Sequence, residues 1–328
     1  MPETETTVKT VTANLKVYRY DPEVGDAKPY YQDYEVEVED WFTVLDALIK
    51  IREEIDGTLS LRCACRASIC GSCAMKVNGE AKLVCKTKLD SVWSPGETVT
   101  VDPPGNMPVI TDLVADFKPF WDKVRQVKPY MQPTGPVPTA EYLAPNEDMV
   151  HLAGVMNCIM CGACVSDCTV LEVDKSFIGP AALAKAYRFV ADPRDGKKKE
   201  RLGELNGDAG IWDCTRCMQC VEVCPKDVDP MERIMVMRDQ AIEEGYTGTS
   251  GARHTESFVN SVRRSGRLNE TRLAIESMGV MNIPGQISMA PVGIKALLKG
   301  KLPSPLDHKI PSKAAVKKIV EKSEETSK

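Results

Sequence analysis

Two runs of cysteines constrain this chain more than any other feature of its sequence. The first is Cys158-Ile-Met-Cys-Gly-Ala-Cys-Val-Ser-Asp-Cys168, and the second is Cys214-Thr-Arg-Cys-Met-Gln-Cys-Val-Glu-Val-Cys224, which Pro225 follows. Both have the spacing C-x2-C-x2-C-x3-C, in which three thiolates wrap one cubane iron–sulfur cluster and the fourth binds the other cluster. The pattern therefore predicts a domain that binds two clusters.

The crossing of the fourth cysteines divides these residues into two ligand sets. One cluster takes Cys158, Cys161, Cys164 and Cys224, and the other takes Cys168, Cys214 and Cys220, with Cys217 available. The short gaps let a tight loop direct its amide N–H groups at the cluster. A pair of structural zinc sites is the alternative, but zinc sites use two pairs of ligands, so we favour clusters.

The composition indicates a protein that stays inside the cell. Its 328 residues suffice for two domains, and no apolar run approaches the roughly 18 residues that a membrane-spanning helix needs. The start, Met1-Pro-Glu-Thr-Glu, lacks the basic and apolar regions of a secretory signal. We therefore expect a cytoplasmic protein whose 13 cysteines bind metal. A net charge of −5 gives no reason to expect nucleic-acid binding.

The first hundred residues predict a small β-grasp sheet. Apolar and polar residues alternate along Thr10–Val17 and again along Tyr34–Val38, as in half-buried strands. We expect a helix from Trp41 to Asp56, capped by Asp40, and a strand over Thr98–Val101 that closes the sheet.

A further cysteine pattern lies between that helix and the last strand. Its spacing, C-x4-C-x2-C…C, is the plant-type pattern for a [2Fe–2S] cluster and is formed by Cys65, Cys70, Cys73 and Cys85. Cys63 lies outside the pattern, and we interpret it as a buried structural thiol.

The interval before the fourth of these cysteines predicts how the chain returns to the loop. Asn78-Gly79 is a strong signal for a two-residue hairpin turn. A turn at that point pairs Cys73 with Val84, which brings Cys85 to the mouth of the cysteine loop.

Proline separates this region from the cysteine runs. Nine of the 22 prolines lie between Pro103 and Pro145, which favours an extended linker over a long helix. Its apolar part, Val109–Val124, should pack between the domains.

The second domain should be helical. We expect a short helix over Met149–Asn157, another from Gly179-Pro180 to a point before Pro193, and a third over Pro230–Glu244. The charged stretch Asp192–Glu204 is interpreted as a solvated loop. The methionines of the third helix are interpreted as core residues.

Together these motifs resemble the iron–sulfur subunit of succinate dehydrogenase and fumarate reductase over roughly residues 10 to 245. The segment Cys65-Arg-Ala-Ser-Ile-Cys-Gly-Ser-Cys-Ala-Met75 is similar to the family's signature. The resemblance implies an α+β fold: an N-terminal β-grasp [2Fe–2S] ferredoxin domain over 8–106, a proline-rich linker over 107–146, an all-α two-cluster ferredoxin domain over 147–248, and a helical, basic extension over 249–328.

The resemblance also implies a function. In the family, this subunit carries electrons between an FAD-containing flavoprotein, where succinate is oxidised, and a quinone or a membrane-anchor subunit. We therefore expect a [2Fe–2S] cluster, a [4Fe–4S] cluster and a third centre, but no catalytic residue for dicarboxylate chemistry in this chain. The complex should be peripheral on the inner face of the cytoplasmic membrane through its partner subunits.

Two features depart from the usual family pattern, one at the third centre and one at the acceptor site. Most members have another residue at the position of Cys217 and hold a [3Fe–4S] third centre, so the cysteine here favours [4Fe–4S]. The family's quinone pocket uses a proline and a histidine where this chain has Thr169 and Thr215. The resemblance therefore does not carry over the ordinary quinone site.

The C-terminal extension has a resemblance of its own. The segments His254–Arg263, Gly266–Glu270 and Ala296–Pro303 are similar to the small iron–sulfur subunit of heterodisulfide reductases. This implies the less common succinate dehydrogenase type, whose membrane-side partner is a cysteine-rich protein like the heterodisulfide reductase catalytic subunit. From Ile294 onward the chain has nine lysines and four acids. We interpret this tail as solvated, the alternative being a segment that docks on anionic lipid or a partner.

Three further hypotheses stay open at this point. The chain could belong to a fumarate reductase running in the reverse direction, or to a heterodisulfide- or thiol-linked fumarate reductase. It could also be a free ferredoxin-like carrier, although such a carrier needs neither the aromatic linker nor the long tail. The scattered histidines His151, His254 and His308 are given no catalytic role.

Overall fold

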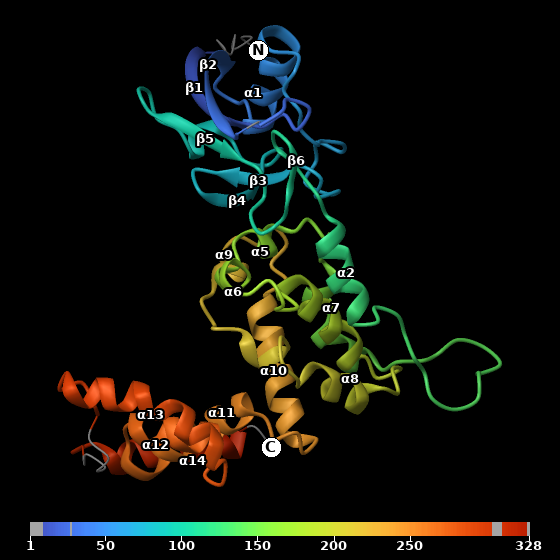
Figure 1. Cartoon of the computed structure of the whole chain (residues 1–328). Helices are drawn as coiled ribbons and strands as arrows, with labels where there is room; N and C mark the ends of the chain where they lie inside the picture. Colours follow the sequence, from blue (N-terminus) through green and yellow to red (C-terminus); the bar gives the residue numbers. More distant parts are fainter. Residues whose placement is uncertain (1–8, 27, 304–309, 327–328) are drawn as a thin grey trace, which may run out of the picture. The chain divides into compact units, whose positions relative to one another are not determined.

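The computed structural model describes residues 9–26, 28–303 and 310–326, and the chain forms two compact units, Met1–Met237 and Arg238–Lys328. Figure 1 shows their elements coloured along the sequence. All 13 cysteines lie in the first unit, which therefore contains every cluster site predicted from the sequence.

The first unit begins with a five-stranded sheet (Figure 1). Its strands are β1 (Thr10–Arg19), β2 (Tyr30–Glu39), β3 (Ala74–Val77), β4 (Glu80–Leu83) and β5 (Thr98–Asp102), in the order β2-β1-β5-β3-β4. The two alternating segments are strands, as predicted. The prediction that β5 closes the sheet is wrong, because β5 pairs with β1 on one side and β3 on the other.

The helix beside this sheet begins later than expected. α1 covers Val44–Lys50 and continues as a π-helical turn over Ile51–Ile55. Thr43, not Asp40, is its N-cap: the Thr43 side chain accepts a hydrogen bond from the Asp46 amide, and the Asp46 carboxylate accepts one from the Thr43 amide. This reciprocal capping box fixes the start of the helix. Its buried face, with that of the sheet, forms the core: Ala13, Leu15, Val17, Val36, Val38, Val44, Leu45, Leu48, Val99 and Val101.

The hairpin prediction is confirmed. β3 and β4 pair with Val77 opposite Glu80, and Asn78 and Gly79 both have positive φ, 51° and 86°, as a two-residue primed turn requires. The Val84 amide donates to the Cys73 carbonyl at 3.3 Å. Cys85 therefore lies beside the cysteine loop because of the turn chemistry.

The linker contains structure of its own. A small hairpin, β6 (Val109–Thr111) and β7 (Val114–Ala115), precedes α2 (Lys118–Gln126), which packs against α7 (Pro180–Val190). Phe120 is buried and contacts the rings of Phe117 and Trp121 edge to face. The apolar part of the linker is thus folded onto the second half of the unit.

Helices lie before, within, between and after the two cysteine runs. They are α3 (Asn146–Met149), α4 (Ala153–Met156), α5 (Ala163–Ser166), α6 (Thr169–Val173), α7, α8 (Lys198–Leu205), α9 (Gln219–Glu222) and α10 (Pro230–Glu243), with single 3-10 turns at Leu89–Ser91, Val150–Leu152 and Ile211–Asp213. The predicted helices before the first run, after Gly179 and after Pro230 are present. In the last of these, Met237 is buried, as a core residue would be.

The interpretation of Asp192–Glu204 as a solvated loop is wrong. The segment contains most of α8, and Asp192, Asp195 and Arg201 are buried. Arg201 donates twice to the Asp195 carboxylate and also to the carbonyls of Val127, Lys128 and Tyr130. Charged residues are buried at this point because they pair with one another and with backbone groups.

The second unit is helical. It contains α11 (Ser250–Ser265), α12 (Glu270–Met278), α13 (Ile283–Leu298) and α14 (Lys313–Thr326), and α11 packs against α12 and α14. Thr249 and Asn269 cap α11 and α12 through their side chains. Among the described residues, no helix combines the length and apolar character needed to cross a bilayer.

Candidate iron–sulfur sites

A tight loop directs backbone amides at the sulfurs of the binuclear motif. Positive φ values at Arg66, Ser68 and Gly71 curl the chain between Cys65 and Cys73. The amides of Ala67, Ile69 and Cys70 donate to Cys65 Sγ at 3.3 to 3.4 Å, and the Ser68 amide donates to Cys85 Sγ at 3.3 Å. Such donors stabilise the negative charge of thiolate ligands.

The four cysteines of this motif lie together but differ in exposure. Cys65 and Cys70 are exposed, Cys85 is half-buried, and Cys73 is buried beside Cys85. The Ser72 hydroxyl, 3.1 Å from Cys70 Sγ, helps to lower the pKa of that thiol to about 6, whereas burial raises the pKa of Cys73 to about 12. A cluster held by these residues would have one side at the protein surface.

Cys63 is the remaining cysteine of this region. It is half-buried rather than fully buried and packs against the core of the sheet. Its contacts are those of a small apolar side chain, in line with a structural rather than a ligating thiol.

The predicted first set of the two-cluster domain lines one pocket. Cys158, Cys161, Cys164 and Cys224 surround it, together with residues of α7 and the start of α10. Gly162, with φ of 81°, begins α5 and leaves room for Phe117, whose ring would lie 3.0 Å from an added Cβ. Burial raises the pKa of Cys161 to about 11 and also raises that of Cys164 well above its usual value.

The second set, with Cys217 in it, lines another pocket. Cys168, Cys214, Cys217 and Cys220 meet there beside apolar residues that include Phe177 and Ile234. Burial raises the pKa of Cys220 to about 12. At Cys217 burial acts in the same direction, but hydrogen bonds from the Thr169 hydroxyl, at 3.4 Å, and from backbone amides outweigh it and lower the pKa.

The crossing of the fourth cysteines is thus a property of the fold. α5 packs against α9, so each cysteine run contributes its last member to the pocket of the other. Within the described ranges, no three histidine, cysteine or acidic residues are grouped tightly enough to hold a single metal ion.

Close contacts join the binuclear loop to the two-cluster domain. A Cβ added to Gly71 would lie 2.7 Å from the Cβ of Cys161, so the two cysteine loops touch. Asp167, next to Cys168, accepts a hydrogen bond from the Ala81 amide at 2.7 Å and lies 3.4 Å from Lys76 Nζ. The loops that carry the predicted ligands are therefore held against one another.

Asn106 is a second connection, and the spacing rules did not predict it. Its side-chain amide donates to the carbonyls of Val165, Ser166 and Cys168 at 2.9 to 3.1 Å, and the adjacent Gly105 amide donates to Ser166 Oγ at 2.9 Å. Carbonyls at the end of α5 have no partner within the helix, so this side chain satisfies them. The Pro-Pro-Gly turn before Asn106 was visible in the sequence, but nothing indicated its partners.

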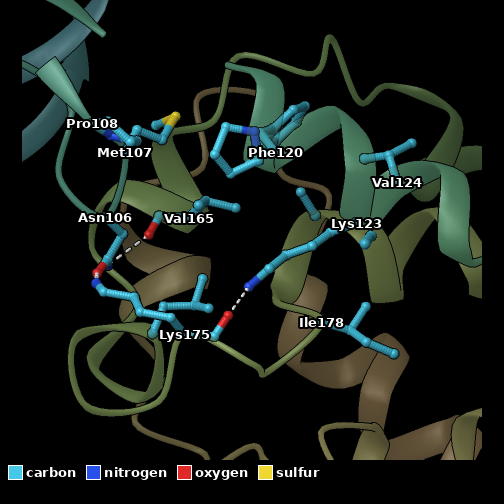
Figure 2. A pocket seen from close by; sticks show the side chains of 13 residues that line it. Asn106, Met107, Pro108, Phe120, Lys123, Val124, Val165, Lys175 and Ile178 are labelled. Carbon is cyan, nitrogen blue, oxygen red and sulfur yellow. Dashed lines mark hydrogen bonds between the residues drawn. The ribbon is translucent and has the colours of Figure 1, made fainter. Parts of the chain in front are cut away.

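A pocket of about 460 Å³ opens beside α2, where the linker meets α5, α6 and α7 (Figure 2). Lys123 Nζ donates to the carbonyls of Lys175 and Phe177 at 2.7 and 2.5 Å, and Lys175 Nζ donates to Asn106 Oδ1 at 2.7 Å. The remaining wall is mostly apolar: Met107, Pro108, Phe120, Val124, Val165, Leu171 and Ile178. Its polar groups fasten the loop that follows α6, and hence the segment after Cys168.

Known proteins match both halves of this arrangement. Residues 14–122 match the family described as the 2Fe-2S iron-sulfur cluster binding domain, and residues 154–228 match the 4Fe-4S dicluster domain. The iron-sulfur subunit of mitochondrial succinate dehydrogenase from Dictyostelium discoideum is 40% identical over 230 residues, covering 67% of this chain and 79% of that protein.

Two further relatives extend the comparison. The fumarate reductase iron-sulfur subunit of Mycobacterium tuberculosis is 41% identical over 218 residues, covering 66% of this chain and 87% of the relative. A chain of the Mycobacterium smegmatis Sdh1 complex in the apo form superposes with a TM-score of 0.66 at 28% identity, covering 73% of this chain and 98% of that one. Conserved fold and sequence over this length make the chain a member of the family of iron–sulfur subunits of succinate dehydrogenase and fumarate reductase.

Proposed function

We propose that this electron-transfer subunit holds three clusters in three sets of four cysteines: a [2Fe–2S] cluster on Cys65, Cys70, Cys73 and Cys85, a [4Fe–4S] cluster on Cys158, Cys161, Cys164 and Cys224, and a second [4Fe–4S] cluster on Cys168, Cys214, Cys217 and Cys220. When bound, the clusters supply one-electron redox chemistry. The chain supplies thiolates, amide donors and burial, which together set the potentials.

The single observation that carries the third assignment is the shared pocket of Cys168, Cys214, Cys217 and Cys220. A three-iron centre would leave Cys217 as a spare thiol in that pocket. The Thr169 hydroxyl and nearby amides lower its pKa, so it is prepared to act as a thiolate. These features support [4Fe–4S] over [3Fe–4S].

The test is EPR of the anaerobically purified holoprotein after mild oxidation, with an iron and sulfide count. The unmodified chain, called the parent below, should give no near-isotropic three-iron signal. Cys217→Ser should give that signal, lose one iron and leave the binuclear spectrum unchanged, whereas Cys63→Ser, the matched control, should change neither. A strong three-iron signal from the parent, or an unchanged third centre in Cys217→Ser, would contradict the assignment.

We further propose that the subunit works in a peripheral complex on the inner face of the cytoplasmic membrane. Its partners are an FAD-containing flavoprotein that acts on succinate and a membrane-side subunit, of the cysteine-rich heterodisulfide-reductase-like type or a membrane anchor. The exposed side of the binuclear loop, with Cys65 and Cys70, suits electron exchange with a partner. Copurification with a flavoprotein is expected, and a chain that purifies alone from its native cells would contradict the proposal.

The direction of turnover has a second candidate. Relatives named for succinate dehydrogenase and for fumarate reductase match at similar identity, 40% and 41%. In a fumarate reductase, electrons would pass through the same clusters in the opposite direction, toward the flavoprotein. In a heterodisulfide- or thiol-linked form, thiols would supply those electrons. Rates of succinate oxidation, fumarate reduction and thiol-dependent fumarate reduction by the purified complex distinguish the three.

A further inference from the structure

The helix α13 exposes a continuous apolar stripe. Ile283, Ile287, Ile294 and Leu297 recur at helical spacing and share one face, and Leu298 borders it. The exposed fractions of these five side chains lie between 57% and 81%. Scattered exposed apolar residues are ordinary, but a contiguous row of this kind marks a binding surface.

One flank of the helix is held within the second unit. Gln286 donates to the carbonyls of Gly279 and Val280 at 3.1 and 3.2 Å. A Cβ added to Gly285 would lie 3.0 Å from the terminal methyl of Met278, so α13 packs closely on the end of α12. The half-buried residues, Gly285, Gln286, Gly293 and Ala296, lie on the flank next to Leu297, and Val292 on the opposite face is exposed. The stripe is therefore presented outward on an anchored helix.

The charge around the stripe has one sign. From Ser277 to Leu306 the sequence has no acidic residue, although the chain as a whole carries a net charge of −5. The same interval contains Lys295, Lys299 and Lys301. Lys295 lies on the flank of the stripe next to Leu298, where its aliphatic stem can run beside apolar groups and its ammonium group can reach a polar layer, and Lys299 is the C-cap of the helix.

We propose that α13 docks this chain directly on an anionic bilayer surface. At 16 residues the helix is about 24 Å long, shorter than the roughly 20 residues that span a hydrocarbon core, so it would lie in the headgroup region. An apolar face bordered by Lys295, with Lys299 and Lys301 just past the end of the helix, fits that position. A second copy of the chain fits less well, because this interval offers no acid to pair with the lysines of its partner. The proposal goes beyond electron transfer and holds whether or not the third cluster is assigned correctly.

The experiment uses the full cluster-loaded chain and flotation with lipid vesicles. Phosphatidylcholine vesicles are compared with vesicles that also contain phosphatidylglycerol. The test variant is Ile287→Asp with Ile294→Asp, and its matched control is Val137→Asp with Leu143→Asp, since both control side chains are 81% exposed in the linker. Circular dichroism and cluster absorbance check that each variant is folded.

We expect the parent and the linker control to float with the anionic vesicles and the α13 variant to stay in solution. Lys295→Gln with Lys299→Gln and Lys301→Gln should weaken binding to anionic vesicles by roughly a hundredfold, from about one kilocalorie per mole for each lysine. Hydrogen exchange over 280–300 should slow when vesicles are added, which locates the contact on α13.

Two outcomes would overturn the proposal. In the first, neither vesicle binds the parent, or the α13 variant binds as well as the parent does. In the second, light scattering finds that the parent self-associates through α13 without binding lipid, which would make the stripe a contact between copies. Neither outcome bears on the cysteine assignments, which are read from EPR.

Discussion

Gly71 and Cys161 are in direct contact, although they belong to different cysteine motifs: a Cβ added to Gly71 would lie 2.7 Å from Cys161 Cβ and 2.9 Å from its Cα. Gly71 also has φ of 74°, which other residues rarely adopt. We expect Gly71→Ala to push the binuclear loop away from the two-cluster domain. The measurement is the EPR spin–spin interaction between the reduced binuclear centre and the first cubane, which should weaken.

Gly96→Ala is the control that separates the effect of backbone strain from that of the contact between Gly71 and Cys161. Gly96 has φ of 93°, yet nothing lies within 4 Å of its added Cβ. Gly96→Ala should therefore lose about as much stability from backbone strain as Gly71→Ala does, roughly 1 kcal/mol. The spin–spin interaction between the two centres should stay at the value of the unmodified chain. Equal effects of the two substitutions on that interaction would contradict the role of the Gly71 contact.

Cys85→Ser tests the first ligand set. Because the hairpin at Asn78-Gly79 returns Cys85 to a loop that contains the other three members, we expect the substitution to weaken or remove the binuclear centre alone. Absorbance and EPR of the two other centres should be retained. Loss of the cubane signals in the same variant would mean that the division into ligand sets is wrong.

The side chain of Asn106 should stabilise the contact between the two cluster-binding parts of the chain. Replacing it by aspartate puts a carboxylate where an amide donates to three carbonyls, so we expect the free energy of unfolding to fall by about 3 kcal/mol. Asn106→Gly, which keeps the positive φ of 60° without the amide, should cost less. Denaturant unfolding monitored by cluster absorbance measures both. An aspartate variant as stable as the parent would show that the three bonds are dispensable.

The sequence predicted what depends on local spacing. The Asn78-Gly79 turn and the alternation in β1 and β2 act within a few residues of chain, and the structure has both. The cysteine intervals are equally local, and the ligand sets that they imply stay a prediction. The contacts of Gly71 and Asn106 join residues about 60 to 90 positions apart, so no local pattern encodes them. The start of α1 was missed because Thr43 and Asp46 form a stronger cap than Asp40.

The prediction of a solvated loop over Asp192–Glu204 was wrong for a different reason. Composition reports the charge of a side chain but not its partner, and Arg201 uses all five of its donors on Asp195 and three linker carbonyls. A charged stretch whose members pair with one another looks the same in sequence as a solvated one. Arg201 therefore attaches the linker to α8 through these hydrogen bonds.

Arg201→Met tests that fastening. The substitution leaves the buried Asp195 carboxylate without its cation and the three linker carbonyls without a donor, so we expect a loss of about 3 kcal/mol in the free energy of unfolding. Arg125→Met on α2 is the control: Arg125 pairs with Asp122 at the surface, where solvent screens the pair, so the substitution should change the free energy of unfolding far less. Limited proteolysis should cut the linker faster in the Arg201 variant only. Equal losses in the two variants would argue against a structural role for the buried pair.

Tyr34 gives the fold a dependence on alkaline pH. Burial, supported by the hydrogen bond that the phenol donates to Asp56 at 2.7 Å, raises its pKa from 10.0 to about 12. A raised pKa means that the folded chain holds the neutral phenol more tightly than the unfolded chain does. The stability that results is fully present below pH 10 and is lost as the pH rises toward 12.

Two measurements check this expectation. Phenolate absorbance during an alkaline titration should include a late step near pH 12, to which Tyr31 also contributes because Asp102 accepts its hydrogen bond and raises its pKa to about 12. Tyr34→Phe should reduce that step and flatten the fall in unfolding free energy between pH 10 and 12. If Tyr34→Phe left the late step at its full size, burial and Asp56 would not be holding the Tyr34 phenol neutral. The phenol would then ionise earlier, beside Arg19 and Asp56, without loss of the fold.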